Sequence, residues 1–402
     1  MTAFNVVSCA YDEYRIYKVV AMANNNVTLG AAKTAKKDEF YTQLTDIEKE
    51  VRHYKKHFKG KVVLCNCDDP FESNFFKYFV LNFNKLGLKK LIATCYSTSP
   101  IRGKQFDYTV DANGQMSFVI ECSEPVGLFC DKAIGKGKKP YKAIVTTVYD
   151  KTGDGGLDML DIAKLFESGE NKLEELKGDG DFRSDECIGI LKEADIVVTN
   201  PPFSLFRDYI NTLIQYDKKF LVIGHQNAIT YSDLFPLFME NKIWLGYGFQ
   251  GNVGFFESPY EDTAVSSQHK EGLIRVSGVM WFTNMDIKKR HEELILVKRY
   301  SPDRYISYTN FNAIDISNVN DIPCDYAGYM GVPITFMEKY NPDQFELLGT
   351  STGNLAKLLG VTPNYRGRTD VAYIGEDGKP KCPYQRLIIR NKKPEKPLEV
   401  NV

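Results

Sequence analysis

Between residues 44 and 58, apolar side chains recur at steps of three and four, the spacing of one buried face of an α-helix. The run KVVLCNC, residues 61–67, then predicts a buried strand. A loop and a second helical pattern follow, and KKLIATCYS, residues 89–97, predicts the next strand. Strand, helix and strand in this order are typical of a doubly wound α/β sheet. The first helix is expected to bury Leu44, Ile47, Val51, Tyr54 and Phe58.

The same alternation returns after residue 179. The pattern predicts a helix over residues 185–193, a strand over 195–199, a helix over 205–216 and a strand over 218–229. In the first of these strands Ile, Val, Val and Thr follow one another without polar alternation, so we expect it to be buried on both faces. We therefore expect one α/β domain over about residues 30–250.

Two stretches depart from this alternation. Residues 98–177 include FDYTVDANGQMSFVIEC, which predicts a hairpin that turns at Asn113-Gly114, so we expect a β-rich insertion there. Residues 251–402 contain short strand patterns, Gly and Pro turns and tyrosines, which predict a second, smaller, mixed domain. Its end, residues 364–402, holds nine Lys and Arg against five Asp and Glu. Such a basic run suits phosphate contacts, although it is as often plain solvated surface.

Composition narrows the class of protein. With 402 residues, 43% apolar and 26% charged, the chain is an ordinary folded globular protein. Its formal net charge of −1 argues weakly against a purely electrostatic nucleic-acid binder, so any such contact requires local basic patches. Nine cysteines show no C-x-x-C pair and no zinc spacing, which favours reduced thiols in the cytoplasm. No apolar run reaches membrane-spanning length, so no membrane contact is expected.

The most specific signal is TNPPF, residues 199–203, directly after the buried strand. Pro201 and Pro202 fix their own φ and remove N–H donors, and Pro201 holds Asn200 in extended geometry. The Asn200 side-chain oxygen and the Pro201 carbonyl then form a rigid pair of acceptors, suited to binding both hydrogens of an exocyclic amine. Phe203 would stack on the ring that carries this amine. Such a turn can also simply end a strand, but in an α/β sheet it lies where ligands bind.

TNPPF after an apolar strand resembles the catalytic motif of amino-group methyltransferases dependent on S-adenosylmethionine, above all the N6-adenine DNA methyltransferases. The runs KKDEFYTQLTDIEKEV, FKGKVVLCNCDDPFESNFFKYF and MGVPITFMEKYNPDQFELLG are similar to the EcoRI-type adenine modification methyltransferases, over about residues 33–350. The resemblance implies a Rossmann-like methyltransferase sheet over residues 30–250 and a target-recognition, DNA-binding region over 251–402. It implies that the catalytic residues are Asn200, Pro201, Pro202 and Phe203, and that the target adenine is flipped into this turn.

The resemblance also implies where the cofactor binds. DEFYTQ is similar to the motif that lines the methionine part, and CDDPFES to the loop after the first strand, where a carboxylate pairs with the ammonium group. GDGDFRS is similar to the motif that holds the adenine ring. Ser73 and Phe75 stand where such enzymes commonly have glycines, so the backbone cannot approach the ligand in the usual way. Without the resemblance, the same stretches would be interpreted as the residues that precede a helix and as solvent-exposed turns. The implied cofactor residues are Phe40, Tyr41, Thr42, Asp68, Asp69, Pro70, Asp181 and Phe182.

One further motif suggests a metal. DKTGDGGLDMLD, residues 150–161, spaces its carboxylates much as a calcium loop does. A calcium loop of this kind follows a helix and ends in Glu, whereas residues 141–149 have a strand pattern and the last position is Asp161. We therefore expect no metal site.

Together these features predict a site-specific DNA adenine N6-methyltransferase that uses S-adenosylmethionine and acts on double-stranded DNA in the cytoplasm. A restriction endonuclease acting on the same site would be its counterpart, without direct contact, and the chain is expected to be a monomer or weak dimer. Two alternatives stay open. The acceptor pair equally suits an amine of an RNA base or a protein glutamine, and the glycines missing after Asp69 would suit a catalytically silent, nucleic-acid-binding relative.

Overall fold

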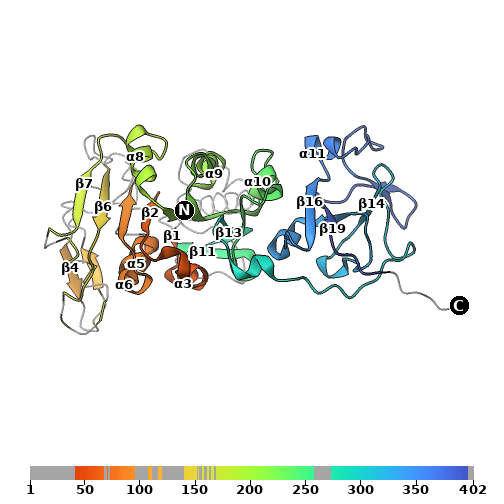
Figure 1. Ribbon diagram of the computed structural model, residues 1–402. Coiled ribbons are helices and arrows are strands. Elements are labelled where there is room, and N and C mark those ends of the chain that lie inside the picture. Colours follow the sequence, from red (N-terminus) through yellow and green to blue (C-terminus); the bar gives the residue numbers. More distant parts are fainter. Residues whose placement is uncertain are drawn as a thin grey trace, which may run out of the picture.

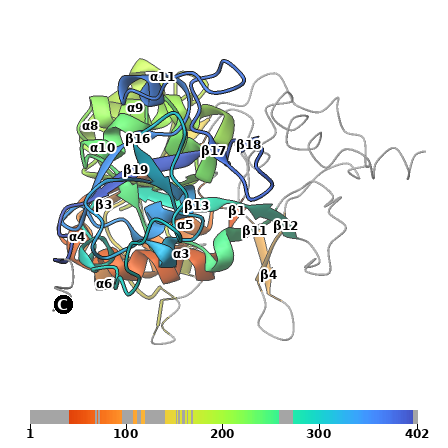
Figure 2. The ribbon, with the colours of Figure 1, turned by 90° about the vertical axis from the view of Figure 1, so that its right-hand side faces the viewer.

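The structure is a computed structural model, shown from two sides in Figures 1 and 2. It describes residues 41–67, 70, 73–95, 107–110, 116–119, 140–151, 153, 156–157, 161–162, 164–166, 169–257 and 273–396. Three of the predicted cofactor residues, Phe40, Asp68 and Asp69, lie outside the described residues, and so does the predicted turn at Asn113-Gly114.

The largest sheet in the described part of the chain has eight strands, in the order β10-β13-β9-β8-β2-β3-β6-β7 (Figure 1). Its four central strands, β9, β8, β2 and β3, run parallel, and the strands at both margins are antiparallel to their neighbours. The predicted α/β class with a large sheet is confirmed. The bounds are β2 (Val62–Asn66), β3 (Lys90–Thr94), β6 (Tyr141–Val145), β7 (Lys172–Glu175), β8 (Ile196–Thr199), β9 (Lys219–His225), β10 (Trp244–Leu245) and β13 (Val279–Thr283).

Helices cover both faces of the central strands, as strand β2 illustrates. Val62 and Leu64 belong to the apolar cluster that includes α8 and α9, whereas Val63 and Cys65 belong to the cluster that includes α3 and α5. A strand whose alternate side chains are buried on opposite sides has to be apolar throughout, which is why its sequence shows no alternation. The helices are α3 (Leu44–Val51), α4 (Lys55–Phe58), α5 (Asn74–Leu81), α6 (Phe83–Leu86), α8 (Asp185–Glu193) and α9 (Phe206–Gln215).

The predicted first helix is present as three consecutive pieces. After α3 the chain tightens into the 3₁₀ turn η1 (Arg52–Tyr54) and continues as α4. The apolar face remains continuous through the change, because Ile47, Val51, Tyr54 and Phe58 are all fully buried. Periodicity therefore predicted the buried face correctly, although it did not indicate the change of helix type.

A buried carboxylate ties this first helix to the turn after β10. Glu50 is 1% exposed and accepts hydrogen bonds from the Tyr54 hydroxyl at 2.8 Å and from the backbone N–H groups of Tyr247 at 2.8 Å and Gly248 at 2.9 Å. Burial raises the pKa of Glu50, although these hydrogen bonds and the Lys289 charge act in the opposite direction. The carboxylate thus fixes the turn against α3.

The large sheet extends beyond the limits expected from the sequence. Within the predicted insertion, residues 98–177, strands β6 and β7 join the edge of the large sheet, while β4 (Asp107–Val110) and β5 (Met116–Val119) form a separate antiparallel pair. Strand β13 lies after the expected boundary at residue 250 but pairs with β9 in the same sheet. Strand order depends on distant pairing, so local patterns could not indicate it.

A small three-stranded sheet lies beside the large one. Strand β11 (Val253–Glu257) pairs with both β1 (Tyr41–Thr42) and β12 (Leu273–Ser277). In β1 the pairing joins Thr42 to Phe256, so the motif near the start of the described chain is held by a strand more than two hundred residues later.

The part of the chain after strand β13, the C-terminal unit, shares a hydrophobic core with the large sheet. Its own sheet has the order β14-β15-β19-β16 within the described residues (Figure 1). Met330 and Ile389 of this sheet belong to the same apolar cluster as Phe206 and Phe238. The elements are β14 (Ala313–Asp315), β15 (Tyr329–Pro333), β16 (Phe345–Thr350), β17 (Tyr373–Ile374), β18 (Pro380–Lys381), β19 (Arg386–Asn391), α10 (Phe235–Met239), α11 (Gly353–Leu358), η2 (Phe203–Leu205), η3 (Gln226–Thr230), η4 (Gln250–Asn252), η5 (Lys288–His291), η6 (Val319–Asp321) and η7 (Ile334–Lys339).

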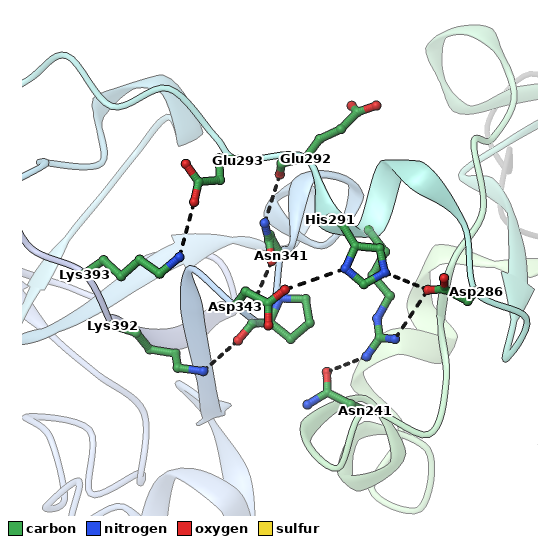
Figure 3. A network of polar contacts seen from close by, with 11 residues as sticks. Asn241, Asp286, His291, Glu292, Glu293, Asn341, Asp343, Lys392 and Lys393 are labelled. Carbon is green, nitrogen blue, oxygen red and sulfur yellow. Dashed lines mark hydrogen bonds and ion pairs between the residues drawn. The ribbon is translucent and has the colours of Figure 1, made fainter.

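Polar contacts at the junction of the two units reinforce this shared core (Figure 3). The His291 ring lies between two carboxylates, with Nε2 2.7 Å from Asp286 Oδ1 and Nδ1 3.6 Å from Asp343 Oδ2. Nearby, the Asn341 side chain donates to the Glu292 carbonyl at 3.3 Å. The connection between the units is therefore held by side chains from both.

Among the described residues, no helix is long and apolar enough to cross a membrane.

Candidate active site

The carboxyl ends of the neighbouring strands β2 and β8 lie at the point in the sheet where the strand order reverses. From β2 the chain passes through α5 to β3 on one side, whereas β8 pairs on the other side of β2. In open α/β sheets ligands bind in the crevice at such a point. The two strand ends are fastened together, because the Thr199 hydroxyl at the end of β8 donates a hydrogen bond to the Asn66 carbonyl at the end of β2.

The four predicted catalytic residues follow β8 immediately and form one turn. Asn200 and Pro201 are buried, while Pro202 and Phe203 are partly exposed. The Pro202 carbonyl accepts from the Leu205 N–H at 2.9 Å, which starts the 3₁₀ turn η2 that leads into α9. Phe203 packs against the apolar cluster that contains α3 and α5. A proline-stiffened, buried amide and carbonyl thus stand at the carboxyl edge of the sheet, where they can accept hydrogen bonds from a planar amine.

Two aromatic side chains, Tyr209 and Phe182, lie next to the end of β2 in the candidate site. The Tyr209 hydroxyl, on α9, donates a hydrogen bond to Asn66 Oδ1. Burial raises the pKa of Tyr209 well above its ordinary value, so this hydroxyl stays protonated as a donor. Phe182 packs edge-on against the Tyr209 ring, with centroids 5.0 Å apart. One of the predicted adenine-binding residues is therefore linked through two contacts to the end of β2.

Asp181, the predicted partner of the cofactor's adenine, is occupied by a neighbouring arginine. Arg183 donates to it from Nε at 2.9 Å and from Nη2 at 2.6 Å, and from its own backbone N–H at 2.9 Å. The same guanidinium lies 5.3 Å from the centre of the Phe182 ring. For the Asp181 carboxylate to accept from an adenine amine, Arg183 has to share or release at least one carboxylate oxygen.

Thr42 lies beside the helix that follows the predicted carboxylate loop. The Asn74 side chain, at the start of α5, donates to the Thr42 carbonyl at 2.8 Å. Thr42 is 1% exposed, and its hydroxyl oxygen has no hydrogen-bond partner within the described residues. A buried hydroxyl without a partner is costly, so this atom is suited to a ligand contact. Tyr41 next to it is half-buried, and Pro70, in the loop itself, is buried.

Ser73, which stands where such enzymes commonly have a glycine, has a structural role, and the turn out of β2 has an unusual backbone conformation. Ser73 is the N-cap of α5 and accepts from the Phe75 N–H at 3.2 Å. Cys67, at the exit from β2, has φ of +106°, a left-handed region that favours glycine and costs a cysteine backbone strain. The sharp turn out of β2 is therefore made one residue before the Asp68-Asp69 pair.

Sequence reasoning missed Asn66, Cys67 and Tyr209 as parts of this site. Asn66 carried a signal, because it is a polar residue inside an otherwise apolar strand. Tyr209 carried none, since an aromatic on the apolar face of a helix usually serves only in packing.

In the loop that resembles a calcium site, the carboxylates of the described residues accept hydrogen bonds from backbone N–H groups of the same loop. Asp150 accepts from the Gly153 N–H at 2.6 Å, and Asp161 accepts from the Lys151 N–H at 2.7 Å. Asp154 and Asp158 lie outside the described residues. Among the residues that the structure describes, no cluster of His, Cys, Asp and Glu could hold a metal ion.

Comparison with known proteins defines the class. The family described as "Adenine-specific methyltransferase EcoRI" matches residues 28–392. Type II methyltransferase M.EcoRI from Escherichia coli is 41% identical over 384 residues, which cover 93% of this chain and 100% of that protein. Type II methyltransferase M.MpnI from Mycoplasma pneumoniae is 34% identical over 369 residues, 90% of this chain and 97% of that protein. No solved structure matches the chain.

The fold and these matches define the protein as a methyltransferase. The chain belongs to the Adenine-specific methyltransferase EcoRI family, which confirms the resemblance seen in its motifs.

Proposed function

We propose that the protein is a site-specific DNA methyltransferase that transfers a methyl group from S-adenosylmethionine to N6 of adenine in double-stranded DNA. The observation that carries the proposal is the Asn200–Phe203 turn at the carboxyl end of β8, fastened to the end of β2 at the divergence of the sheet. Family membership supports the same reaction. We also infer that the large sheet is a Rossmann-like methyltransferase sheet, and that residues 251–402 recognise the target, apart from strand β13, which belongs to the large sheet.

The roles of the turn follow from the chemistry of the acceptor. The N6 amine of adenine is a weak nucleophile because its lone pair is delocalised into the ring. Acceptance of its two hydrogens by Asn200 Oδ1 and the Pro201 carbonyl localises that lone pair and orients it. Phe203 would stack on the adenine ring, while Pro202 keeps the turn stiff. Because the turn is buried, an adenine within a duplex has to be flipped out to reach it.

S-adenosylmethionine, when bound, supplies a methyl group already activated by a cationic sulfur. The unpartnered Thr42 hydroxyl fits a polar ligand, and half-buried Tyr41 and Phe182 offer apolar surface. The remaining contacts are proposed from the family motifs: Phe40, Asp68, Asp69 and Pro70 for the methionine part, and Asp181 for the adenine.

The proposed setting follows from the reaction. Adenine methylation at a specific sequence protects that sequence from a restriction endonuclease, which would share the site with this protein without touching it. We infer a cytoplasmic protein that acts as a monomer or weak dimer.

The proposal is tested by incubating purified protein with S-adenosylmethionine labelled with tritium in its methyl group, in parallel with unmethylated duplex DNA, RNA and a glutamine-rich protein. Label recovered as N6-methyladenine from DNA is the expected result. Label in RNA or protein alone would refute the DNA substrate and retain the amine chemistry. No transfer, together with no S-adenosylmethionine binding by calorimetry, would indicate a silent relative.

A further inference from the structure

A short loop in the C-terminal unit is rigidly shaped by one buried asparagine. We call residues 364–368, with the sequence NYRGR, the NYRGR loop. The Asn364 side-chain oxygen accepts from the backbone N–H groups of Arg366 at 2.8 Å and Arg368 at 3.4 Å, and the Asn364 backbone N–H donates to the Arg368 carbonyl at 2.9 Å. Gly367 supplies the left-handed φ of +69° that closes the turn. These bonds fix the backbone that carries both arginines.

The base of the loop is braced as well. The Asn364 amide donates to the Asp370 carbonyl at 3.1 Å and to Cys382 Sγ at 3.3 Å, which ties the loop to the residues after β18. The Asn310 side chain donates to the carbonyls of Thr362 at 2.7 Å and Asp370 at 2.8 Å. Because hydrogen bonds within the loop and at its base fix the backbone, the loop already has its shape before a partner binds.

The side chains that the loop presents have no structural use in the described chain. Arg366 and Arg368 are exposed and form no ion pair within the described residues. Arg366 lies 5.0 Å from the centre of the Tyr365 ring, which is 48% exposed. Other arginines after residue 250 do form ion pairs: Arg290 with Asp286, Arg299 with Asp325 and Glu395, Arg386 with Asp315, and Arg390 with Glu346.

The loop is joined to the segment that follows the β17–β18 hairpin, through the Asn364 amide and Cys382. In the view of Figure 2 this hairpin lies toward the same side as β1, β11 and β12, and β1 contains Thr42, whereas Figure 1 shows the C-terminal unit and these strands separated along the length of the molecule. Beyond the hairpin, Tyr384 is 91% exposed, the most exposed large hydrophobic side chain among the described residues. Arginines without an ion pair, next to the exposed Tyr365 on a preformed loop, match the chemistry of a nucleic-acid contact. Guanidinium groups bind phosphates and guanine edges in a bidentate manner.

We propose that the NYRGR loop contacts the duplex DNA substrate, with Arg366 and Arg368 as the binding groups. This inference rests on the proposed function and specifies which part of the C-terminal unit holds the DNA. Asn364 acts as a positioning residue, since this buried side chain fixes the backbone from which both arginine side chains project.

The test compares wild type with the double variant Arg366→Gln/Arg368→Gln, using fluorescence anisotropy to measure the Kd for a methylatable duplex. A control is Lys219→Gln, which removes an exposed cation at the amino end of strand β9. The candidate site lies at the other end of the parallel strands, at their carboxyl ends. We expect the double variant to raise the Kd for duplex by at least about tenfold, as the loss of one good arginine contact would. The control should stay within about twofold of wild type.

Two further readouts separate the loop from the reaction. S-adenosylmethionine affinity and melting temperature should match wild type in the double variant, because both arginines are exposed and form no ion pair within the described residues. If wild type methylates adenine and the double variant has a Kd for duplex within about twofold of the wild-type Kd, the role of the loop is wrong and the proposed function stands. A wild type that neither binds duplex nor methylates adenine would overturn the proposed function together with this inference.

Discussion

The hydrogen bond between Tyr209 and Asn66 offers a sharp test of how the active-site edge is held. Replacing Tyr209 by Phe removes one oxygen and leaves the ring, which packs 5.0 Å from Phe182 and is 1% exposed. The change therefore creates almost no cavity. Its main effect is to leave the Asn66 side-chain oxygen, in a residue that is 8% exposed, without this donor.

The expected magnitude follows from that geometry. A buried acceptor that loses its donor costs about 1–3 kcal/mol, so the free energy of unfolding of Tyr209→Phe should fall by about this amount. The assay is equilibrium unfolding in urea, with Tyr216→Phe as the control. Tyr216 caps the same helix, and its ring lies under Lys192 rather than in the site.

A double-mutant cycle isolates the hydrogen bond from the general cost of each change. The losses in free energy of unfolding caused by Asn66→Ala alone and by Tyr209→Phe alone should add up to more than the loss in the double variant. The difference, the coupling energy, should be about 1 kcal/mol. Strict additivity, within about 0.3 kcal/mol, would refute the hydrogen bond as a determinant of this edge.

Three further predictions test the site and the fold. Thr42→Val should lower S-adenosylmethionine affinity by about tenfold in calorimetry while leaving the melting temperature equal or higher, because the variant removes a buried hydroxyl that lacks a partner; equal affinity would exclude Thr42 from the cofactor site. Burial raises the pKa of Glu50, so the folded state holds this proton more tightly than the unfolded state does, and that stabilisation is lost as pH rises through the raised pKa. Glu50→Gln should therefore gain stability relative to wild type as pH rises from about 4 to about 8, and a constant difference across this range would contradict the raised pKa. Gly224→Ala should cost about 1–3 kcal/mol in urea unfolding, since the new Cβ would lie 2.4 Å from the Phe206 ring; wild-type stability would show that the ring has room to move.

Much of the large sheet could be predicted because its central strands are buried on both faces. The expected strand over residues 195–199 is β8, and the expected helix over 185–193 is α8. The strand expected over 218–229 is shorter, because His225 accepts from the Asn227 N–H at 3.2 Å and the chain turns into η3. Such a local side-chain contact ends a strand without changing its apolar pattern.

The candidate site was predictable where motifs are local and not where contacts are distant. The Asn200–Phe203 turn and Phe182 were found from short motifs, and the structure brings both to the ends of adjacent strands. The bond from Tyr209 to Asn66 joins residues 143 positions apart, so no local pattern encodes it. The ion pair that Arg183 makes with Asp181 was likewise missed, since a sequence motif gives no side-chain direction.

The central claim, that Asn200 holds the amine that receives the methyl group, is tested most directly by single-turnover methyl transfer to duplex DNA. Wild type would be compared with Asn200→Ala and with the control Asn211→Ala, which alters an exposed asparagine on α9. We predict that Asn200→Ala slows formation of N6-methyladenine by about a hundredfold or more, with S-adenosylmethionine affinity within about threefold of wild type. A rate for Asn200→Ala within about threefold of wild type and of the control would contradict the account.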